Sequence, residues 1–220
     1  MSFNIWNFIA KFAAEKPVEV PLEIKKLPLK SDQYYPSKQK KTHIFLHHSA
    51  GGSAASSVAG WAATPEHIAT PYIIDRDGSI YETYSPDFWA YHLGVKGATW
   101  LEKASIGIEI CSYGQLTPNT AGELLTYTKK VIPKEKAAKV TFRGFNYYEA
   151  YTPEQIAALK VLLPYLIRRF SIPLQPDRKN FYEYQDPSKL PPGIWSHTTV
   201  RKDKVDIFPQ KELVDLVYNL

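Results

Sequence analysis

The segment HIFLHHSAGG, residues 43–52, places two adjacent histidines at the end of an apolar run and directly before a glycine-rich turn. A short and continuous apolar run is typical of a β-strand that is buried on both faces. A histidine at the end of such a strand is either a solvated residue at the sheet edge or a metal ligand at the rim of a cleft. Periodicity alone does not choose between His47 and His48 for the second role.

Further segments predict the remaining parts of a sheet and the helices around it. Residues 71–84, PYIIDRDGSIYETY, have the pattern of a β-hairpin that turns at Asp77-Gly78, and residues 105–111 alternate as a strand. A helix is expected to begin after the N-cap residue Thr152, and a second one over residues 210–218. The sequence therefore predicts an α/β protein with a single central, mainly mixed β-sheet flanked by helices.

The chain is expected to divide at residue 42. Residues 1–41 combine an amphipathic helix with an extended linker rich in proline and lysine, and residues 42–220 form the main domain. The apolar stripe of the helix suits docking on the domain, or else a membrane surface or a partner protein. Residues 116–148 are polar, aromatic and interrupted by proline, so we expect loops and short extended pieces there.

Composition limits the classes of partner and of compartment. The 27 basic and 22 acidic residues give a net charge of +5, which favours anionic partners, but no Lys/Arg block is long enough to indicate nucleic acid. Cys111 is the single cysteine, so no intrachain disulfide forms, and it is expected to be a buried small hydrophobe rather than a metal ligand. Neither a signal peptide nor a membrane span is expected.

A group of polar residues has the chemistry of a catalytic zinc site. His197 precedes Asp206 by nine residues with Lys204 between them, and Glu109 stands in an otherwise apolar strand. Two histidines and one aspartate would hold zinc and leave a position for water. A carboxylate such as Glu109 can transfer the proton of that water, and a lysine can stabilise an oxyanion. Structural charge pairs are the competing interpretation of the same residues.

Five motifs carry a resemblance to a known family. They are IFLHHSAGG, IIDRDGSIYE, WAYHLG, ASIGIEI and SHTTVRKDKVDIF, and they occur in this order between residues 42 and 210. Together they resemble the zinc-dependent N-acetylmuramoyl-L-alanine amidases, a family that includes phage lysis amidases, bacterial muropeptide amidases and peptidoglycan recognition proteins. The resemblance implies the fold of these proteins and a zinc cofactor.

The resemblance also implies roles for individual residues. The zinc ligands would be His47, His197 and Asp206. Glu109 would be the general base, and Lys204 would act beside the metal. His92, in the aromatic-His-Leu-Gly segment, would lie on the substrate side of the cleft or stabilise its loop. Pro71 and Ile207 depart from the family pattern, and neither departure removes a ligand.

The expected function follows from the resemblance. The chain would be a bacteriolytic peptidoglycan hydrolase that cleaves the amide between the lactyl group of N-acetylmuramic acid and the L-alanine of the stem peptide. A non-catalytic peptidoglycan-recognition module and a zinc peptidase acting within the stem peptide are the alternatives. We expect a monomer, either a phage lysis enzyme made in the host cytoplasm and acting on the cell wall or a cytoplasmic bacterial enzyme.

Overall fold

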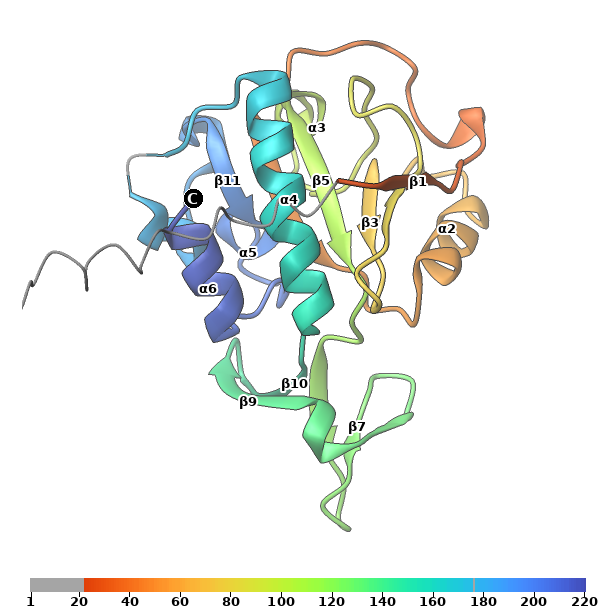
Figure 1. Ribbon diagram of the computed structural model, residues 1–220, viewed down its shortest axis with the longest axis vertical. Coiled ribbons are helices and arrows are strands. Elements are labelled where there is room, and N and C mark those ends of the chain that lie inside the picture. Colours follow the sequence, from red (N-terminus) through yellow and green to blue (C-terminus); the bar gives the residue numbers. More distant parts are fainter. Residues whose placement is uncertain (1–21, 176) are drawn as a thin grey trace, which may run out of the picture.

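The computed structural model of the chain describes residues 22–175 and 177–220. The amphipathic helix predicted near the N-terminus lies outside these residues. Within them the chain forms a mixed α/β fold, with a central β-sheet flanked by helices and a second sheet beyond one end of it (Figure 1). The predicted fold class is confirmed. None of the helices described is long and apolar enough to cross a membrane.

The central sheet has six strands in the order β1-β4-β3-β5-β2-β11. They are β1 (Ile24–Lys26), β2 (His43–His48), β3 (Tyr72–Ile74), β4 (Ile80–Glu82), β5 (Ser105–Ile110) and β11 (Gly193–Ser196). Strands β3, β5, β2 and β11 are parallel to their neighbours in that series, and β3 and β4 form the predicted antiparallel hairpin. The sheet is therefore mixed, and its parallel part ends at one common edge.

The alternation of side chains in β2 and β5 gives the sheet one mainly apolar face. Ile106, Ile108 and Ile110 share one face with Ile44 and Leu46, and all five are fully buried. Helices α4 (Pro153–Phe170) and α6 (Lys211–Tyr218) cover this face (Figure 1). His43, His47, Ser105 and Glu109 lie on the opposite face, so the candidate site residues of both strands project from one side of the sheet.

Helix α4 begins as the sequence predicts. The hydroxyl of Thr152 accepts a hydrogen bond from the backbone N–H of Gln155 at 3.1 Å, and the Gln155 side chain accepts one from the N–H of Thr152 at 3.0 Å. Pro153 occupies the first turn, where its missing N–H costs nothing. The Gln155 amide also donates to the carbonyl oxygen of Cys111 at 2.9 Å, which fixes the start of α4 against the end of β5.

The remaining elements are short. The other helices are α2 (Ala54–Ala62), α3 (Thr99–Ala104) and α5 (His197–Val200). The 3₁₀ turns are η1 (Ser31–Gln33), η2 (Lys134–Lys136), η3 (Arg178–Tyr182) and η4 (Pro187–Lys189). Helix α2 follows the glycine-rich turn after β2 and is capped by Ser53, whose hydroxyl accepts from the N–H of Ser56 at 3.2 Å.

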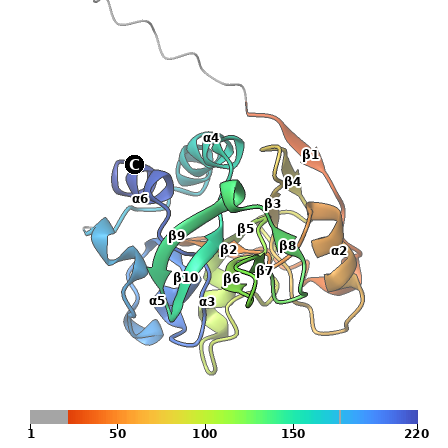
Figure 2. The same cartoon turned by 90° about the horizontal axis from the view of Figure 1, so that it is seen from below.

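Residues 115–149 are more ordered than the sequence predicts. They form a five-stranded antiparallel sheet in the order β8-β7-β6-β10-β9. Its strands are β6 (Gln115–Pro118), β7 (Leu124–Leu125), β8 (Val131–Ile132), β9 (Ala137–Phe142) and β10 (Phe145–Glu149). The strands are short and their hydrophobic cluster contains Leu116, Leu124 and Ile132, so the periodic signal in the sequence is weak. Figure 2 shows this second sheet in front of the central one.

The described part of the predicted linker packs against the domain. Strand β1 pairs with β4 at the edge of the central sheet, and Leu29 is buried. Lys41 is 3 % exposed, and its ammonium group donates to the carbonyl oxygens of Lys103 and Ser105 at 2.8 and 2.9 Å. This segment contains the turn η1 and contributes an edge strand to the central sheet.

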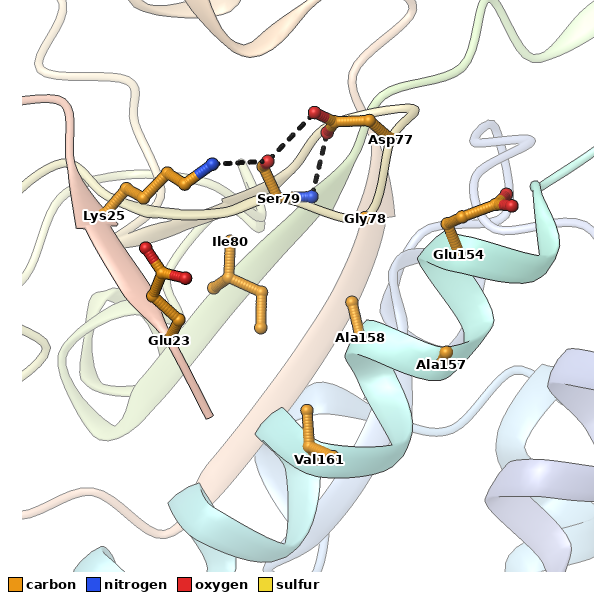
Figure 3. A pocket seen from close by; sticks show the side chains of 10 residues that line it. All are labelled: Glu23, Lys25, Asp77, Gly78, Ser79, Ile80, Glu154, Ala157, Ala158 and Val161. Atoms are coloured by element: carbon orange, nitrogen blue, oxygen red, sulfur yellow. Dashed lines mark hydrogen bonds between the residues drawn. The ribbon is translucent and has the colours of Figure 1, made fainter. Parts of the chain in front are cut away.

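A hollow lies between β1, the β3–β4 turn and α4, on the side of the sheet covered by α4 (Figure 3). At its rim the hydroxyl of Ser79 accepts from the ammonium group of Lys25 and donates to the carboxylate of Asp77, both at 3.0 Å. None of the residues that line this hollow belongs to the predicted zinc site. The site chemistry lies elsewhere, at the ends of the parallel strands.

Candidate metal centre and active site

The carboxyl ends of the parallel strands β2 and β11 bring two histidines together. His47 is the last but one residue of β2, and His197 follows β11 directly as the first residue of α5. Because the two strands pair in parallel, their ends lie at the same edge of the sheet. Asp206 joins them from the segment after α5, where its carbonyl oxygen accepts a hydrogen bond from the N–H of Thr198.

The three side chains direct one potential ligand atom each at a common point. Nδ1 of His47 lies 3.1 Å from Nδ1 of His197 and 3.2 Å from Oδ2 of Asp206. Nδ1 of His197 lies 2.8 Å from the same carboxylate oxygen, and the three ligand atoms lie within 4.8 Å of one another. All three residues are buried. Two imidazoles and one carboxylate form a donor set used by catalytic zinc sites.

The far ring nitrogens of the two histidines are bonded to the protein. Nε2 of His197 lies 2.9 Å from the carbonyl oxygen of Leu93, which can only accept, so this nitrogen carries a proton. Nε2 of His47 lies 3.0 Å from Nδ1 of His92. Each histidine is thus held by one nitrogen while the other faces Asp206, which is the arrangement that ligating histidines adopt. The residues present therefore fit a zinc ion.

The ionisation of the cluster also suits a cation. Burial, and then the charge of the neighbouring His197, lower the pKa of His47 to about 4, although the Asp206 carboxylate acts to raise it. Burial alone would raise the pKa of Asp206, but His197 and His47 hold it well below its usual range. A neutral His47 and an ionised Asp206 are the forms that bind a metal.

Glu109 lies beside this cluster. Its position in β5 pairs with His47 in β2, so both side chains leave the same face of the sheet. Its Oε2 atom is buried and has no hydrogen-bond partner among the described residues. Burial, and then the charge of Asp206, raise the pKa of Glu109 to about 8, whereas Lys204 acts to lower it. A buried carboxylate oxygen with no partner is costly and indicates a functional group.

Lys204 lies in the turn between His197 and Asp206. It borders a hollow that His92, His197 and Arg201 also line. Among the described residues, its ammonium group forms no hydrogen bond or ion pair, whereas the nearby Arg201 is bound to Asp203. Its charge acts on both His47 and Glu109, where it lowers the pKa of each. A free cation is therefore placed beside the carboxylate and the candidate ligands.

The predicted site residue His92 lies behind His47. Its side chain is 3 % exposed, and its Nε2 lies 2.8 Å from the hydroxyl of Ser105. Both ring nitrogens are therefore bonded within the protein, although the residue borders the hollow at Lys204. The substrate contact predicted from the sequence stays a prediction, and what the structure shows is a ring that supports His47.

The two adjacent histidines lie on opposite faces of β2. His48 points to the opposite face of β2, where its Nδ1 lies 3.3 Å from the hydroxyl of Tyr151 and its ring packs on Gly114. Cys111 is buried against Ala54 and Ile73, away from the cluster. Neither residue joins the group of potential ligands.

A groove of about 450 Å³ extends from Glu109 between α2 and the β7–β8 hairpin. We call it the Glu109 groove. One wall is α2 and the turn before it, and the other is the tip of the β7–β8 hairpin; its lining includes Ser56, Trp61, Glu109, Tyr113, Tyr127 and Thr128. Tyr127 is 63 % exposed, and Trp61 is half-buried. Among residues 22–175 and 177–220, Glu109 is the only charged side chain that lines this groove, whereas several line the hollow at Lys204.

Sequence reasoning missed Tyr127 and Ser105. Tyr127 is at the tip of a hairpin whose strands have two residues each, too short to be recognised by alternation. Ser105 precedes Gly107 and Glu109 at alternate positions of β5, so the face it shares with Glu109 could have been found from the strand pattern. The strand pattern does not predict that His92, from another loop, bonds to Ser105.

Comparison with known proteins decides the family. The sequence profile of the N-acetylmuramoyl-L-alanine amidases matches residues 37–210. The chain belongs to this family. The match confirms the resemblance found in the five motifs. It covers strands β2 and β5, the β3–β4 hairpin and the segment from His197 to Asp206.

Solved structures share the fold of this amidase. It is similar to a mutant endolysin from Bacillus subtilis, with 15% identity, 90% of this chain and 97% of that chain covered, and a TM-score of 0.52. The catalytic domain of XlyA gives 15% identity, 89% and 97% coverage, and a TM-score of 0.51. PlyL gives 14% identity, 83% and 84% coverage, and a TM-score of 0.50. No curated protein sequence matches the chain significantly.

Proposed function

We propose that the chain is a zinc-dependent N-acetylmuramoyl-L-alanine amidase, which hydrolyses the amide between the lactyl group of N-acetylmuramic acid and the L-alanine of the stem peptide. The observation that carries this proposal is the buried cluster of His47, His197 and Asp206, whose three ligand atoms converge beside Glu109. Family membership supports the same reaction.

Zinc would be held by Nδ1 of His47, Nδ1 of His197 and Oδ2 of Asp206. When bound, it supplies a water of lowered pKa and an electrophile for the carbonyl oxygen of the scissile amide. Glu109 is the proton carrier: its carboxylate accepts the proton of the attacking water and passes it to the departing amine. The unpartnered Oε2 atom of Glu109 supports this role, since no described protein group competes for it.

Lys204 stabilises the charge that develops on the carbonyl oxygen. Its ammonium group is free of ion pairs among the described residues and borders the hollow next to His197. A preorganised cation beside a developing oxyanion lowers the barrier because the protein pays no reorganisation energy when the charge forms. The same charge opposes the rise that burial and Asp206 cause in the pKa of Glu109.

The two hollows on either side of the cluster suit the two halves of the substrate. The exposed ring of Tyr127, the half-buried ring of Trp61 and several hydroxyl groups line the Glu109 groove, and such surfaces bind neutral sugars through stacking and hydrogen bonds. The hollow with the free cation Lys204 suits the stem peptide, whose carboxylates are anionic. We therefore place N-acetylmuramic acid toward Tyr127 and the peptide toward Lys204.

The same fold also suits two other activities. A recognition module without turnover would bind peptidoglycan and need neither a complete ligand set nor a general base, and all four side chains are present here. A zinc peptidase would use the same chemistry on a bond within the stem peptide. The setting can be phage lysis or a bacterial enzyme acting on wall fragments, and both require the same reaction.

Mass spectrometry of purified peptidoglycan tests the proposal. We expect incubation with the protein to release intact stem peptides that begin with free L-alanine. A chelator should abolish this release and added zinc should restore it. Release of shortened peptides would identify a peptidase instead. Binding of the polymer without any cleavage, with zinc supplied, would identify a recognition module.

A further inference from the structure

A chain of hydrogen bonds leads from the candidate metal ligand His47 into the protein. Nε2 of His47 lies 3.0 Å from Nδ1 of His92, and Nε2 of His92 lies 2.8 Å from the hydroxyl of Ser105. The Ser105 hydroxyl in turn donates to the carbonyl oxygen of Glu102 at 3.3 Å. His47, Ser105 and the His92 side chain are buried, so bulk water does not replace these bonds.

One face of strand β5 leaves room for the ring of His92. Ser105, Gly107 and Glu109 alternate on the same face of the strand, and His92 lies over the middle position. A Cβ atom at Gly107 would lie 3.1 Å from Nδ1 of His92 and 2.5 Å from a methyl carbon of Thr70. Any larger residue would therefore push His92 away from its two partners.

Glu102 holds the backbone around His92 in place. Its buried carboxylate accepts hydrogen bonds from the N–H groups of His92, Leu93 and Gly94, at distances from 2.9 to 3.2 Å. Leu93 is also the residue whose carbonyl oxygen accepts from His197. One carboxylate thus orders the loop that supports both candidate histidine ligands, and this loop has little freedom to move.

The hydrogen bonds that link His47, His92 and Ser105 can run in two directions only. If the Ser105 hydroxyl donates to His92, then His92 donates to His47, and the remaining proton of His47 occupies Nδ1, where a metal would bind. If His47 donates from Nε2, then His92 accepts at Nδ1 and donates from Nε2, and the Ser105 hydroxyl donates to the Glu102 carbonyl oxygen. Only the second direction leaves Nδ1 of His47 free, and it satisfies every donor.

We propose that His92 and Ser105 are positioning residues for the zinc site, which hold His47 with its proton on Nε2 and its Nδ1 lone pair directed at the metal. The inference depends on the proposed zinc site but not on which bond the enzyme cleaves. Both residues act on the site through His47, because the ring of His92 is bonded to His47 at one nitrogen and to Ser105 at the other. Mutation of such supporting partners typically lowers metal affinity by about 10- to 100-fold.

Zinc affinity provides the first test, measured by competition with a fluorescent chelator on the full-length protein. His92→Phe removes the acceptor while it keeps a ring of similar size, and we expect zinc to bind about 10- to 100-fold more weakly. His92→Gln can accept with Oε1 and donate with Nε2, so it should restore most of the affinity. Ser105→Ala should give a smaller loss than His92→Phe, because it removes only the outer bond.

Nitrogen-15 NMR of the histidine rings in the zinc-loaded wild-type protein provides the second test, which does not depend on any variant folding. We expect both His47 and His92 to carry their proton on Nε2. A proton on Nδ1 of His92, or a zinc affinity of His92→Phe within about twofold of wild type, would overturn the inference. Failure of the wild-type protein to bind zinc would instead overturn the proposed function.

Discussion

His47 and Glu109 occupy paired positions on two adjacent parallel strands, in register and on the same face of the central sheet. The register is fixed by the opposite face, where Leu46 and Ile108 are fully buried in the main core. A shift of either strand by one residue would turn its own polar side chain toward that core. The packing of the sheet therefore sets the relation between a candidate metal ligand and the candidate general base.

Replacement of Glu109 by glutamine separates catalysis from metal binding. We expect Glu109→Gln to lower the cleavage of muropeptides by about 10²- to 10⁴-fold, because the amide cannot accept the proton of water. Its zinc content should equal that of wild type, since Glu109 is not among the potential ligands. Turnover by liquid chromatography and zinc by atomic emission check both statements, and unchanged turnover would remove Glu109 from the mechanism.

The same variant should change how stability depends on pH in the metal-free protein. The pKa of Glu109 is raised from 4.5 to about 8 in the folded state, so the unfolded chain ionises first as pH rises. This group therefore lowers the free energy of unfolding between about pH 4.5 and pH 8, by an amount on the order of a few kcal/mol. Glu109→Gln should have a higher melting temperature than wild type, and the difference between the two proteins should be larger at pH 8 than at pH 5. An equal difference at both pH values would contradict the shift.

The neighbouring histidines of β2 form a matched pair of variants. His47→Ala should abolish stoichiometric zinc binding, because it removes one of three protein ligands. His48→Ala should retain zinc and instead lower stability by about 1–3 kcal/mol, because it leaves space between Gly114 and Tyr151 in the buried face. Metal analysis and urea denaturation of both proteins test the assignment, which fails if His48→Ala is the variant that loses zinc.

Tyr127 provides a test of where the sugar binds. Tyr127→Ala should raise KM for a disaccharide-peptide substrate by about 3- to 10-fold, because an exposed ring in the Glu109 groove no longer stacks on the sugar. The KM for a lactyl-peptide that lacks the sugar ring should not change. Tyr184→Ala is the control, since Tyr184 is 44 % exposed and does not line the groove. Equal effects on both substrates would move the sugar elsewhere.

The N-cap of α4 should contribute measurably to stability. Thr152→Ala removes the hydrogen bond from the N–H of Gln155 and the bond that the Thr152 hydroxyl donates to the carbonyl oxygen of Arg76 at 2.8 Å. We expect a loss of about 1–2 kcal/mol in the free energy of unfolding. Thr120→Ala, at an exposed turn, should lie within about 0.5 kcal/mol of wild type. Urea unfolding curves of the two variants give the comparison.

The elements that could be predicted from the sequence are those with a strong local signal. Strand β2 is a continuous apolar run, the β3–β4 hairpin turns at Asp77-Gly78, and α4 has a complete capping box. The ends of parallel strands meet at one edge, which is why His47 and His197 could be expected to lie together once the family was recognised.

Other features depend on contacts between distant segments. The second sheet has strands of two to six residues, and its order could not be read from their composition. The choice of His47 over His48 depends on which face of β2 meets α4. The link between His92 and Ser105 requires the loop before α3 to fold back over Gly107. Periodicity carries no information on such approaches.

The second sheet joins the rest of the molecule between the end of β5 and the start of α4, two points that the Gln155 amide ties together through Cys111. An inserted segment whose two ends lie side by side can change in length or sequence while the central sheet and the candidate metal ligands stay the same. Exchange of the β7–β8 hairpin, whose tip carries Tyr127 and whose apolar residues lie outside the main core, is therefore a route to enzymes with the same reaction and a different preference for cell walls.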